Sequence, residues 1–376
     1  MTIKSSILSI TILLNALFTC AQELPSRDEV LKTAQNVNKY FMTEHADMTA
    51  ETNVRGVTRP SNIWTRSVYY EGLMELYKIF PDESYYEYAY RWAEFHNWDY
   101  RRGATTRNAD NYCAGQIYID LYNLCPEPHK LRVVKANLDM LLYTPQVDDW
   151  TWIDAIQMGM PVLAKMGRLT NDKRYWEKMW QMYAETRNNL AGGLFNTKDG
   201  LWWRDKGFTP PYKEPNGANC YWSRGNGWVY AALVRIMNET PADEAHRKQY
   251  LADFLTMSKA IAKCQRNDGF WNVSLHCEEN FGGKETSGTA LFVYGMAWGV
   301  NNGLLDKDTY LPVILKAWNA MVNDAVHTNG FLGYVQGTGK EPKDGQPVAY
   351  DSVPDFDDYG VGCFLLAATE MYRLAK

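Results

Sequence analysis

Two kinds of segment alternate six times along the chain. One kind is amphipathic and charged, as expected for a helix with one face in water. The other is apolar nearly all round and rich in Gly and Ala, which is typical of a buried helix. The charged segments lie at about 26–46, 83–99, 127–143, 171–190, 243–266 and 308–327, and the buried-type segments that follow them lie at about 64–79, 110–124, 152–169, 222–238, 286–303 and 358–375.

This alternation predicts a ring of helical hairpins. A hairpin of this size cannot bury its inner face alone, so neighbouring hairpins must stack. We therefore expect an all-α fold in which six hairpins close into an (α/α)6 barrel. An open solenoid would give a similar pattern, but the long connections near 191–221, 267–285 and 328–357 break solenoid regularity. Residues 191–203 within the first connection predict a short β-hairpin, and long loops before inner helices usually carry function.

The N-terminus predicts a signal peptide over residues 1–21, with 22–376 forming a single catalytic domain. Lys4 supplies the positive charge, and the run from Ile7 to Phe18 supplies the apolar segment. In a second interpretation, residues 17–20 form a lipoprotein box and Cys20 carries a lipid anchor. Either route predicts an exported protein that is periplasmic or associated with the outer membrane. No other segment is apolar and long enough to be transmembrane.

Composition narrows the classes of ligand. The net charge of -5 is spread without long like-charge runs, which gives no support for nucleic-acid binding. Fourteen Trp and 25 Tyr provide flat faces with polar tips, which suit a sugar ring as well as a large core. The six His have no metal-ligand spacing and no CxxC occurs, so the spacing gives no support for a metal site. Cys264 and Cys277 are the one cysteine pair that a turn-rich loop could join.

The first candidate for chemistry is Asp154, which lies between Trp152 and an apolar helix. A carboxyl group among aromatic side chains is desolvated, and desolvation raises its pKa so that it can act as a general acid. Capping of the helix N-terminus explains the same position equally well. Asp110 begins the preceding inner helix, so adjacent hairpins would bring the two carboxyl groups together. For Asp110 too, capping is the competing explanation.

The second candidate is Arg224, which lies in the segment 221–228 between aromatic residues and glycines. A guanidinium group binds a carboxylate through two hydrogen bonds, and glycine lets the backbone come close. Binding of loop carbonyls by Arg224 is the structural alternative. Further aromatic and basic candidates for substrate binding are Trp222, Trp228, Trp203, Arg204 and Trp64.

Together these segments resemble glycoside hydrolase family 105, the unsaturated rhamnogalacturonyl hydrolases, which are close to the unsaturated glucuronyl hydrolases. The resemblance runs from about residue 60 to the C-terminus. Its most specific stretches are 152–154 with 158–164, 224–228 and 285–290, and Gly337-Thr338-Gly339 also fits.

The resemblance implies an (α/α)6 barrel that removes a 4,5-unsaturated uronic acid from the non-reducing end of lyase-generated oligosaccharides, without a cofactor. It implies that Asp154 is the general acid/base that protonates C4, after which water adds at C5. Asp110 matches the second carboxylate, and Trp152, Arg224 and Trp228 match binding positions. The chain departs from the family pattern at Arg204 and Asn111, where histidines are expected.

Three other functions remain open from the sequence. An inverting glycosidase could use Asp110 and Asp154 as acid and base on a saturated sugar. A sugar epimerase could share the barrel, although such enzymes work through histidines and residues 130–245 contain none. A non-catalytic sugar-binding homologue would explain the missing histidines.

Overall fold

The computed structural model describes residues 23–54 and 56–376. The predicted signal peptide over residues 1–21 and the candidate lipid anchor Cys20 lie outside the described residues. Within the described part of the chain, no helix is long and apolar enough to cross a membrane.

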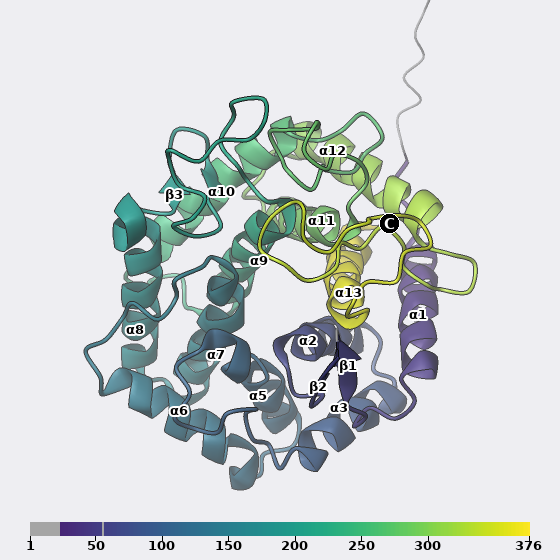
Figure 1. Cartoon of the computed structure of the whole chain (residues 1–376). Helices are drawn as coiled ribbons and strands as arrows, with labels where there is room; N and C mark the ends of the chain where they lie inside the picture. Colours follow the sequence, from purple (N-terminus) through teal and green to yellow (C-terminus); the bar gives the residue numbers. More distant parts are fainter. Residues whose placement is uncertain (1–22, 55) are drawn as a thin grey trace, which may run out of the picture.

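The helices form two concentric rings (Figure 1). The outer ring consists of α1 (Arg27–Glu44), α3 (Glu83–Phe95), α6 (Arg132–Leu142), α8 (Lys173–Ala184), α10 (Arg247–Lys263) and α12 (Lys307–Ala320). The inner ring consists of α2 (Trp64–Ile79), the short α4 (Ala109–Tyr112) with α5 (Gly115–Leu124), α7 (Asp154–Thr170), α9 (Ser223–Glu239), α11 (Thr286–Asn301) and α13 (Asp358–Leu374). These pairs reproduce the six predicted alternations, and the (α/α)6 barrel is confirmed.

The inner ring is closed rather than open. Each inner helix packs on the next along the chain, and α13 returns to pack on α2. Glycines let these last two helices approach closely. A Cβ atom at Gly72 would lie 2.5 Å from the carbonyl oxygen of Gly362, and one at Gly362 would lie 2.2 Å from that of Val68. Small residues at this seam therefore join the end of the barrel to its beginning, which an open solenoid would not need.

Two antiparallel hairpins lie in the connections. Strands β3 (Phe195–Asn196) and β4 (Leu201–Trp202) form the hairpin that was predicted over 191–203. A second hairpin, β1 (Thr52–Val54) with β2 (Val57–Arg59), precedes α2 and was not anticipated from the sequence. The six cysteines in the described residues are free, so the candidate pair Cys264 and Cys277 is not bonded.

The centre of the barrel contains a buried polar network. Glu71 of α2 accepts hydrogen bonds from the side-chain amides of Gln116 (2.8 Å) and Gln157 (2.7 Å). Nε of Arg235 lies 3.6 Å from its carboxylate. Burial raises the pKa of Glu71 to about 7, although Arg235 and Lys165 act to lower it. Four inner helices are thereby joined by groups that would be costly to bury unpaired.

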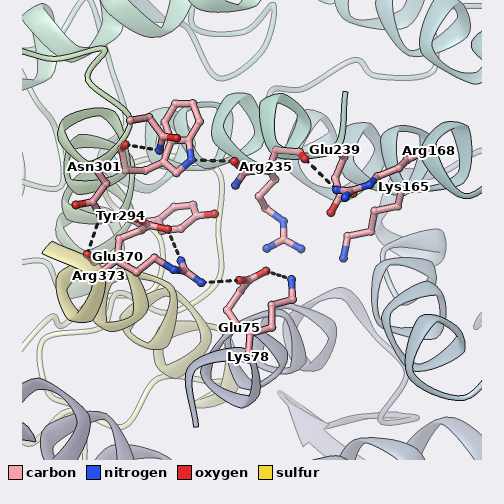
Figure 2. Close-up of a pocket in the computed structure, with 13 residues that line it drawn as sticks. Glu75, Lys78, Lys165, Arg168, Arg235, Glu239, Tyr294, Asn301, Glu370 and Arg373 are labelled. Carbon is pink, nitrogen blue, oxygen red and sulfur yellow. Dashed lines mark hydrogen bonds and ion pairs between the residues drawn. The ribbon is translucent and has the colours of Figure 1, made fainter. Parts of the chain in front are cut away.

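A polar cavity of about 520 Å³ lies where the C-terminal parts of the inner helices meet (Figure 2). Its charged side chains are largely paired with one another. Lys78 contacts Glu75 at 2.7 Å and Arg168 contacts Glu239 at 3.2 Å. The other cations, Arg373, Lys165 and Arg235, pair with Glu370, Asp120 and Glu71, respectively.

Candidate active site

Asp154 is the first residue of α7 and is only 8% exposed. Its side chain does not cap the helix, because the residue before it, Ile153, occupies the N-cap position. Burial raises the pKa of Asp154, while the nearby cations Arg204 and Arg224 act to lower it. Asp154 is thus a desolvated carboxyl group next to positive charge. A single residue that first donates and then accepts a proton needs both features, because burial favours the protonated form and the positive charge stabilises the carboxylate.

Arg204 is held directly against Asp154. Its Nε lies 3.1 Å from Oδ2 of Asp154, and its Nη1 donates to Asp205 at 2.7 Å. The backbone fixes this contact, since the amide of Ile153 donates to the carbonyl of Arg204 at 3.0 Å and Trp152 forms a β-bridge with Asp205. The charge of Arg204 is therefore compensated by two carboxylates of this chain.

Asp110 is half-buried at the start of the preceding inner helix. Asn108, not Asp110, caps this helix, accepting from the amide of Asp110 at 2.9 Å. Desolvation and the charge of Asp154 raise the pKa of Asp110 to about 7, against the opposing effect of Arg204 and Arg101. The two carboxyl groups are therefore electrostatically coupled, as the hairpin arrangement predicted.

Arg224 is buried, with 1% of its surface exposed, and binds loop carbonyls. Its Nη1 and Nη2 donate to the carbonyls of Gln336 and Gly337, both at 2.8 Å. The guanidinium also lies over the rings of Trp222 and Tyr359, 4.6 and 5.0 Å from the centroids. Both Nη atoms therefore hold the loop beside the site, as the structural alternative expected, and the carboxylate clamp stays a prediction.

The candidate tryptophans differ in what they can contact. Trp152, Trp203 and Trp64 are half-buried at the ends of inner helices and loops. Trp222 and Trp228 are 2% and 0% exposed, and the expectation that they contact a substrate stays a prediction. Both support the site from behind, because Trp222 donates to Gln336 at 2.9 Å and Trp228 packs edge-on against Trp64. Residue type alone could not separate these two groups, since all five are tryptophans near the starts of inner helices or in the loops before them.

An open cavity of about 440 Å³ borders Asp110. Trp64 forms part of its wall, and Asn111, where the family pattern has histidine, also lines it while donating to Thr106 at 3.0 Å. Thr338, from a stretch that carries the family resemblance, and Asn108, close to Asp110 in the chain, also line it. Sequence reasoning missed the rest of its lining, which is Arg59, Ile63, Arg101, Arg102 and Phe356. The adjacent arginines at 101 and 102, a few residues before Asp110, were the available signal.

Among residues 23–54 and 56–376, no group of His, Cys, Asp and Glu is arranged to hold a metal ion. The polar groups at this end of the barrel are instead two coupled carboxyls, cations and half-buried aromatic rings. A barrel with these groups at the N-terminal ends of its inner helices belongs to the class of carbohydrate-active (α/α)6 proteins.

Comparison with known proteins narrows this class. Residues 33–375 match the model of Glycosyl Hydrolase Family 88, and the chain belongs to this family. An unsaturated 3S-rhamnoglycuronyl hydrolase from Formosa agariphila is 34% identical over 337 residues, covering 83% of this chain and 85% of that protein. A family 88 glycosyl hydrolase from Bacteroides vulgatus, whose structure is solved, is 34% identical with a TM-score of 0.84, covering 93% and 99% of the two chains.

The family 105 likeness expected from the sequence is also present at the level of the fold. The solved structure of a "possible member of GH105 family" from Salmonella enterica superimposes with a TM-score of 0.74 at 21% identity, covering 98% of this chain and all of that one. The matched family model carries the family 88 label, so the expected label is partly corrected.

Proposed function

We propose that this protein is a glycoside hydrolase that removes a 4,5-unsaturated uronic acid from the non-reducing end of lyase-generated oligosaccharides. The chain's membership of family 88 supports a glycosidase, and the name of the Formosa agariphila relative supports an unsaturated uronyl substrate. We assign the protein to the branch of this group that family 105 represents, on the motifs 152–154 and 224–228.

The observation that carries the proposal is the environment of Asp154. The carboxyl is buried, its pKa is raised, and Arg204 contacts it on one side. A carboxyl in this state holds its proton to higher pH than a solvent-exposed carboxyl does, and after giving it up it exists as a carboxylate stabilised by the adjacent guanidinium.

The chemistry follows from these two states. Asp154 gives its proton to C4 of the enol ether, and positive charge develops at C5 beside the ring oxygen. A water molecule adds its oxygen to C5 and returns a proton to the Asp154 carboxylate. The resulting hemiketal opens and expels the next sugar. Asp110, with a pKa of about 7, orients the water or a substrate hydroxyl.

An assay of double-bond consumption tests this function. The unsaturated ring absorbs in the ultraviolet, so the protein should abolish this absorbance with lyase digests of an acidic polysaccharide. The matched control is the same oligosaccharide with a saturated terminal uronate, which should remain intact. Cleavage of the saturated substrate at a comparable rate would favour the inverting glycosidase, and binding without cleavage would favour a non-catalytic protein.

We also propose that residues 1–21 direct export, on the pattern of Lys4 and the apolar run that follows it. Mass spectrometry of the mature N-terminus after expression in a Gram-negative host separates the two routes. A chain beginning near residue 22 indicates a cleaved signal peptide, and a diacylated Cys20 indicates a lipoprotein. An intact N-terminus would contradict export.

A further inference from the structure

The hairpin that carries Arg204 is fixed to the inner ring by a side chain. Asn226, in the first turn of α9, is fully buried, and its amide group satisfies both polar backbone groups of Trp202 at the end of β4. Its Oδ1 accepts from the amide of Trp202 at 2.8 Å, and its Nδ2 donates to the carbonyl of Trp202 at 3.0 Å. The next amide, that of Trp203, donates to the carbonyl of Leu194 at 3.0 Å. The backbone therefore reaches Arg204 in a fixed position, and only the side chain of Arg204 is left to be directed.

Asp205 directs that side chain. Its Oδ2 accepts from Nη1 of Arg204 at 2.7 Å, and its Oδ1 accepts from the backbone amide of Gly207, also at 2.7 Å. Both carboxylate oxygens of Asp205 are thus in use, one on the guanidinium and one on the turn that follows. The backbone of Asp205 is held as well, by a β-bridge to Trp152. Asp205 is therefore a fixed point that orients the guanidinium plane of Arg204.

Arg204 contacts Asp154 through a single hydrogen bond. Nε of Arg204 lies 3.1 Å from Oδ2 of Asp154. Within the part of the chain that the structure describes, no other residue donates a hydrogen bond to this carboxyl group, and Nη2 of Arg204 does not bond to it. An arginine and a carboxylate frequently form two parallel hydrogen bonds. The observed contact is half of that arrangement and leaves one oxygen of Asp154 outside it.

A second hydrogen bond from Arg204 to Asp154 would work against the reaction. A guanidinium has donors and no acceptor, so a pair of its hydrogen bonds would occupy both oxygens and favour the carboxylate. The carboxyl group must instead hold a proton on one oxygen before it delivers that proton to C4. With the contact limited to Oδ2, the positive charge still stabilises the carboxylate after the transfer, while the second oxygen can carry the proton.

The remaining charges that face Asp154 come from two other inner helices. Burial raises the pKa of Asp154, while Arg204 and, from α9, Arg224 act to lower it. Both Nη atoms of Arg224 donate to loop carbonyls, so this cation is already engaged. On α4, burial and the charge of Asp154 raise the pKa of Asp110. Arg204 is thus the cation that bonds directly to Asp154, and Asp205 is the carboxylate that competes for it.

We propose that Asp205 is a positioning residue that limits Arg204 to a single hydrogen bond with Asp154, and so leaves the second carboxyl oxygen free to carry the proton that is transferred. Asp205 does so by holding Nη1 of Arg204, which keeps Nη2 from the other oxygen of Asp154. This inference rests on the proposed function and deepens it, because it names a residue that keeps Asp154 active as an acid by acting through Arg204.

The pH–rate profile of Asp205→Ala tests this role. Release of Nη1 should let Arg204 form both hydrogen bonds, so the pKa of Asp154 should fall, and the limb of kcat that requires protonated Asp154 should move to lower pH. At neutral pH, kcat should fall about ten- to a hundredfold, the effect of one charge-assisted contact, while KM changes little. Activity should return as the pH is lowered. Loss of Arg204 itself should move the same limb to higher pH, so the two effects are distinguishable.

Further variants separate the charge of Asp205 from its part in the turn. Asp205→Asn keeps an acceptor for the amide of Gly207, so the turn should remain, and the limb should move in the same direction by a smaller amount. Asp205→Glu retains the carboxylate and should restore part of the wild-type profile. When Asp205→Ala is combined with Arg204→Lys, the limb should stay where Arg204→Lys alone places it, because an ammonium group cannot form the planar fork.

Asp268→Ala is the matched control. Asp268 also binds an arginine, Arg266, at 3.1 Å, and accepts from the amide two residues further on, that of Phe270, at 3.2 Å. Arg266 pairs with Glu278 rather than with a carboxyl group of the site, so this variant should leave the limb in place. A limb that stays in place or moves to higher pH in both Asp205→Ala and Asp205→Asn would overturn the proposal.

Carbon-13 NMR separates failure of this role from failure of the proposed function. Aspartate labelled at its side-chain carboxyl carbon is incorporated, and the signal of Asp154 is identified by its absence in Asp154→Asn. The pKa of Asp154 should be lower in Asp205→Ala than in the wild type, even if the wild type consumes no unsaturated substrate. An equal or higher pKa in the variant would reject the positioning role and leave the uronyl hydrolase activity to its own assay.

Discussion

The two ends of the barrel are both lined by charged side chains from the inner helices, but they differ in how those charges are compensated. At the end formed by the helix C-termini, the cations of the cavity in Figure 2 pair with acidic residues, some on the same helix (Lys78 with Glu75) and some on a neighbouring one (Arg168 with Glu239). At the end formed by the N-termini, Arg59, Arg101 and Arg102 have no such partners among the described residues. Asp110 there has a pKa raised to about 7.

This difference distinguishes charges that are paired within the fold from charges that have no partner in it. The two cavities are similar in size, about 520 and 440 Å³, so volume does not distinguish them. Paired charges on different inner helices join those helices, and their loss should affect stability. Unpaired cations and desolvated carboxyls destabilise the folded state, so their presence is better explained by a role in activity. Their loss should therefore affect activity.

The largest expected effect is at the N-terminal end. Asp154→Asn retains the size of the side chain but cannot deliver and retake a proton. Because general acid–base groups contribute about 10²–10⁴-fold, kcat/KM should fall by at least that factor, with little change in Tm. The decrease in ultraviolet absorbance of the unsaturated substrate measures the rate. Near-wild-type activity in this variant would exclude Asp154 from proton transfer.

At the other end, the expected effect is on stability. Arg235→Ala leaves Glu71 buried without its cation, which should lower the free energy of unfolding by about 3–5 kcal/mol. Urea denaturation monitored by circular dichroism measures this change. Arg168→Ala is the control in the same cavity, because its side chain is 64% exposed and its pair with Glu239 should contribute only about 0–1 kcal/mol. Equal effects of the two variants would contradict the structural role assigned to this end.

Arg204→Ala should produce an intermediate effect that pH can resolve. Loss of the contact with Asp154 should reduce kcat/KM about ten- to a hundredfold. Arg204 lowers the pKa of Asp154, so removing it raises that pKa further. The limb of the pH–rate profile that requires protonated Asp154 should then move to higher pH, and Arg204→Lys should leave it nearly in place. If neither the rate nor the limb changes, Arg204 has no role in the reaction.

The smallest expected effect links the site to stability. The pKa of Asp110 is raised from 3.8 to about 7, so the folded state binds more protons than the unfolded state between these values. Stability therefore decreases as pH rises through this window. Asp110→Asn should be more stable than the wild type near about pH 8 and should lose this advantage near about pH 4. The gain should be on the order of 1 kcal/mol, less than the full shift implies at about 1.4 kcal/mol per pKa unit, because solvent screens this half-buried carboxyl.

Thermal unfolding at both pH values measures the effect of Asp110→Asn. Asp243→Asn, at an exposed loop position, is the control and should show no such pH-dependent gain. A variant that is less stable than the wild type at both pH values would show that Asp110 serves the fold rather than the reaction.

The sequence by itself determined the architecture and the position of the carboxyl groups. Hydrophobic periodicity is a local property, so the six alternations predicted the two rings, and the segment 191–203 predicted the hairpin at 195–202. The first residue of a helix can also be predicted from the local sequence. The first residues of neighbouring inner helices lie on one face of the ring and are therefore close together. The coupling of Asp110 and Asp154 therefore followed from spacing alone.

Only the tertiary structure decided which charges are paired and which aromatic rings are accessible. Arg224 and Arg101 are the same residue type near the same carboxyls, yet one binds the carbonyls of Gln336 and Gly337 and the other faces an open cavity. Likewise, Trp64 reaches the cavity while Trp228 lies behind it. Pairing and burial depend on loops more than 100 residues apart that meet only when the ring closes, and no local pattern encodes that meeting.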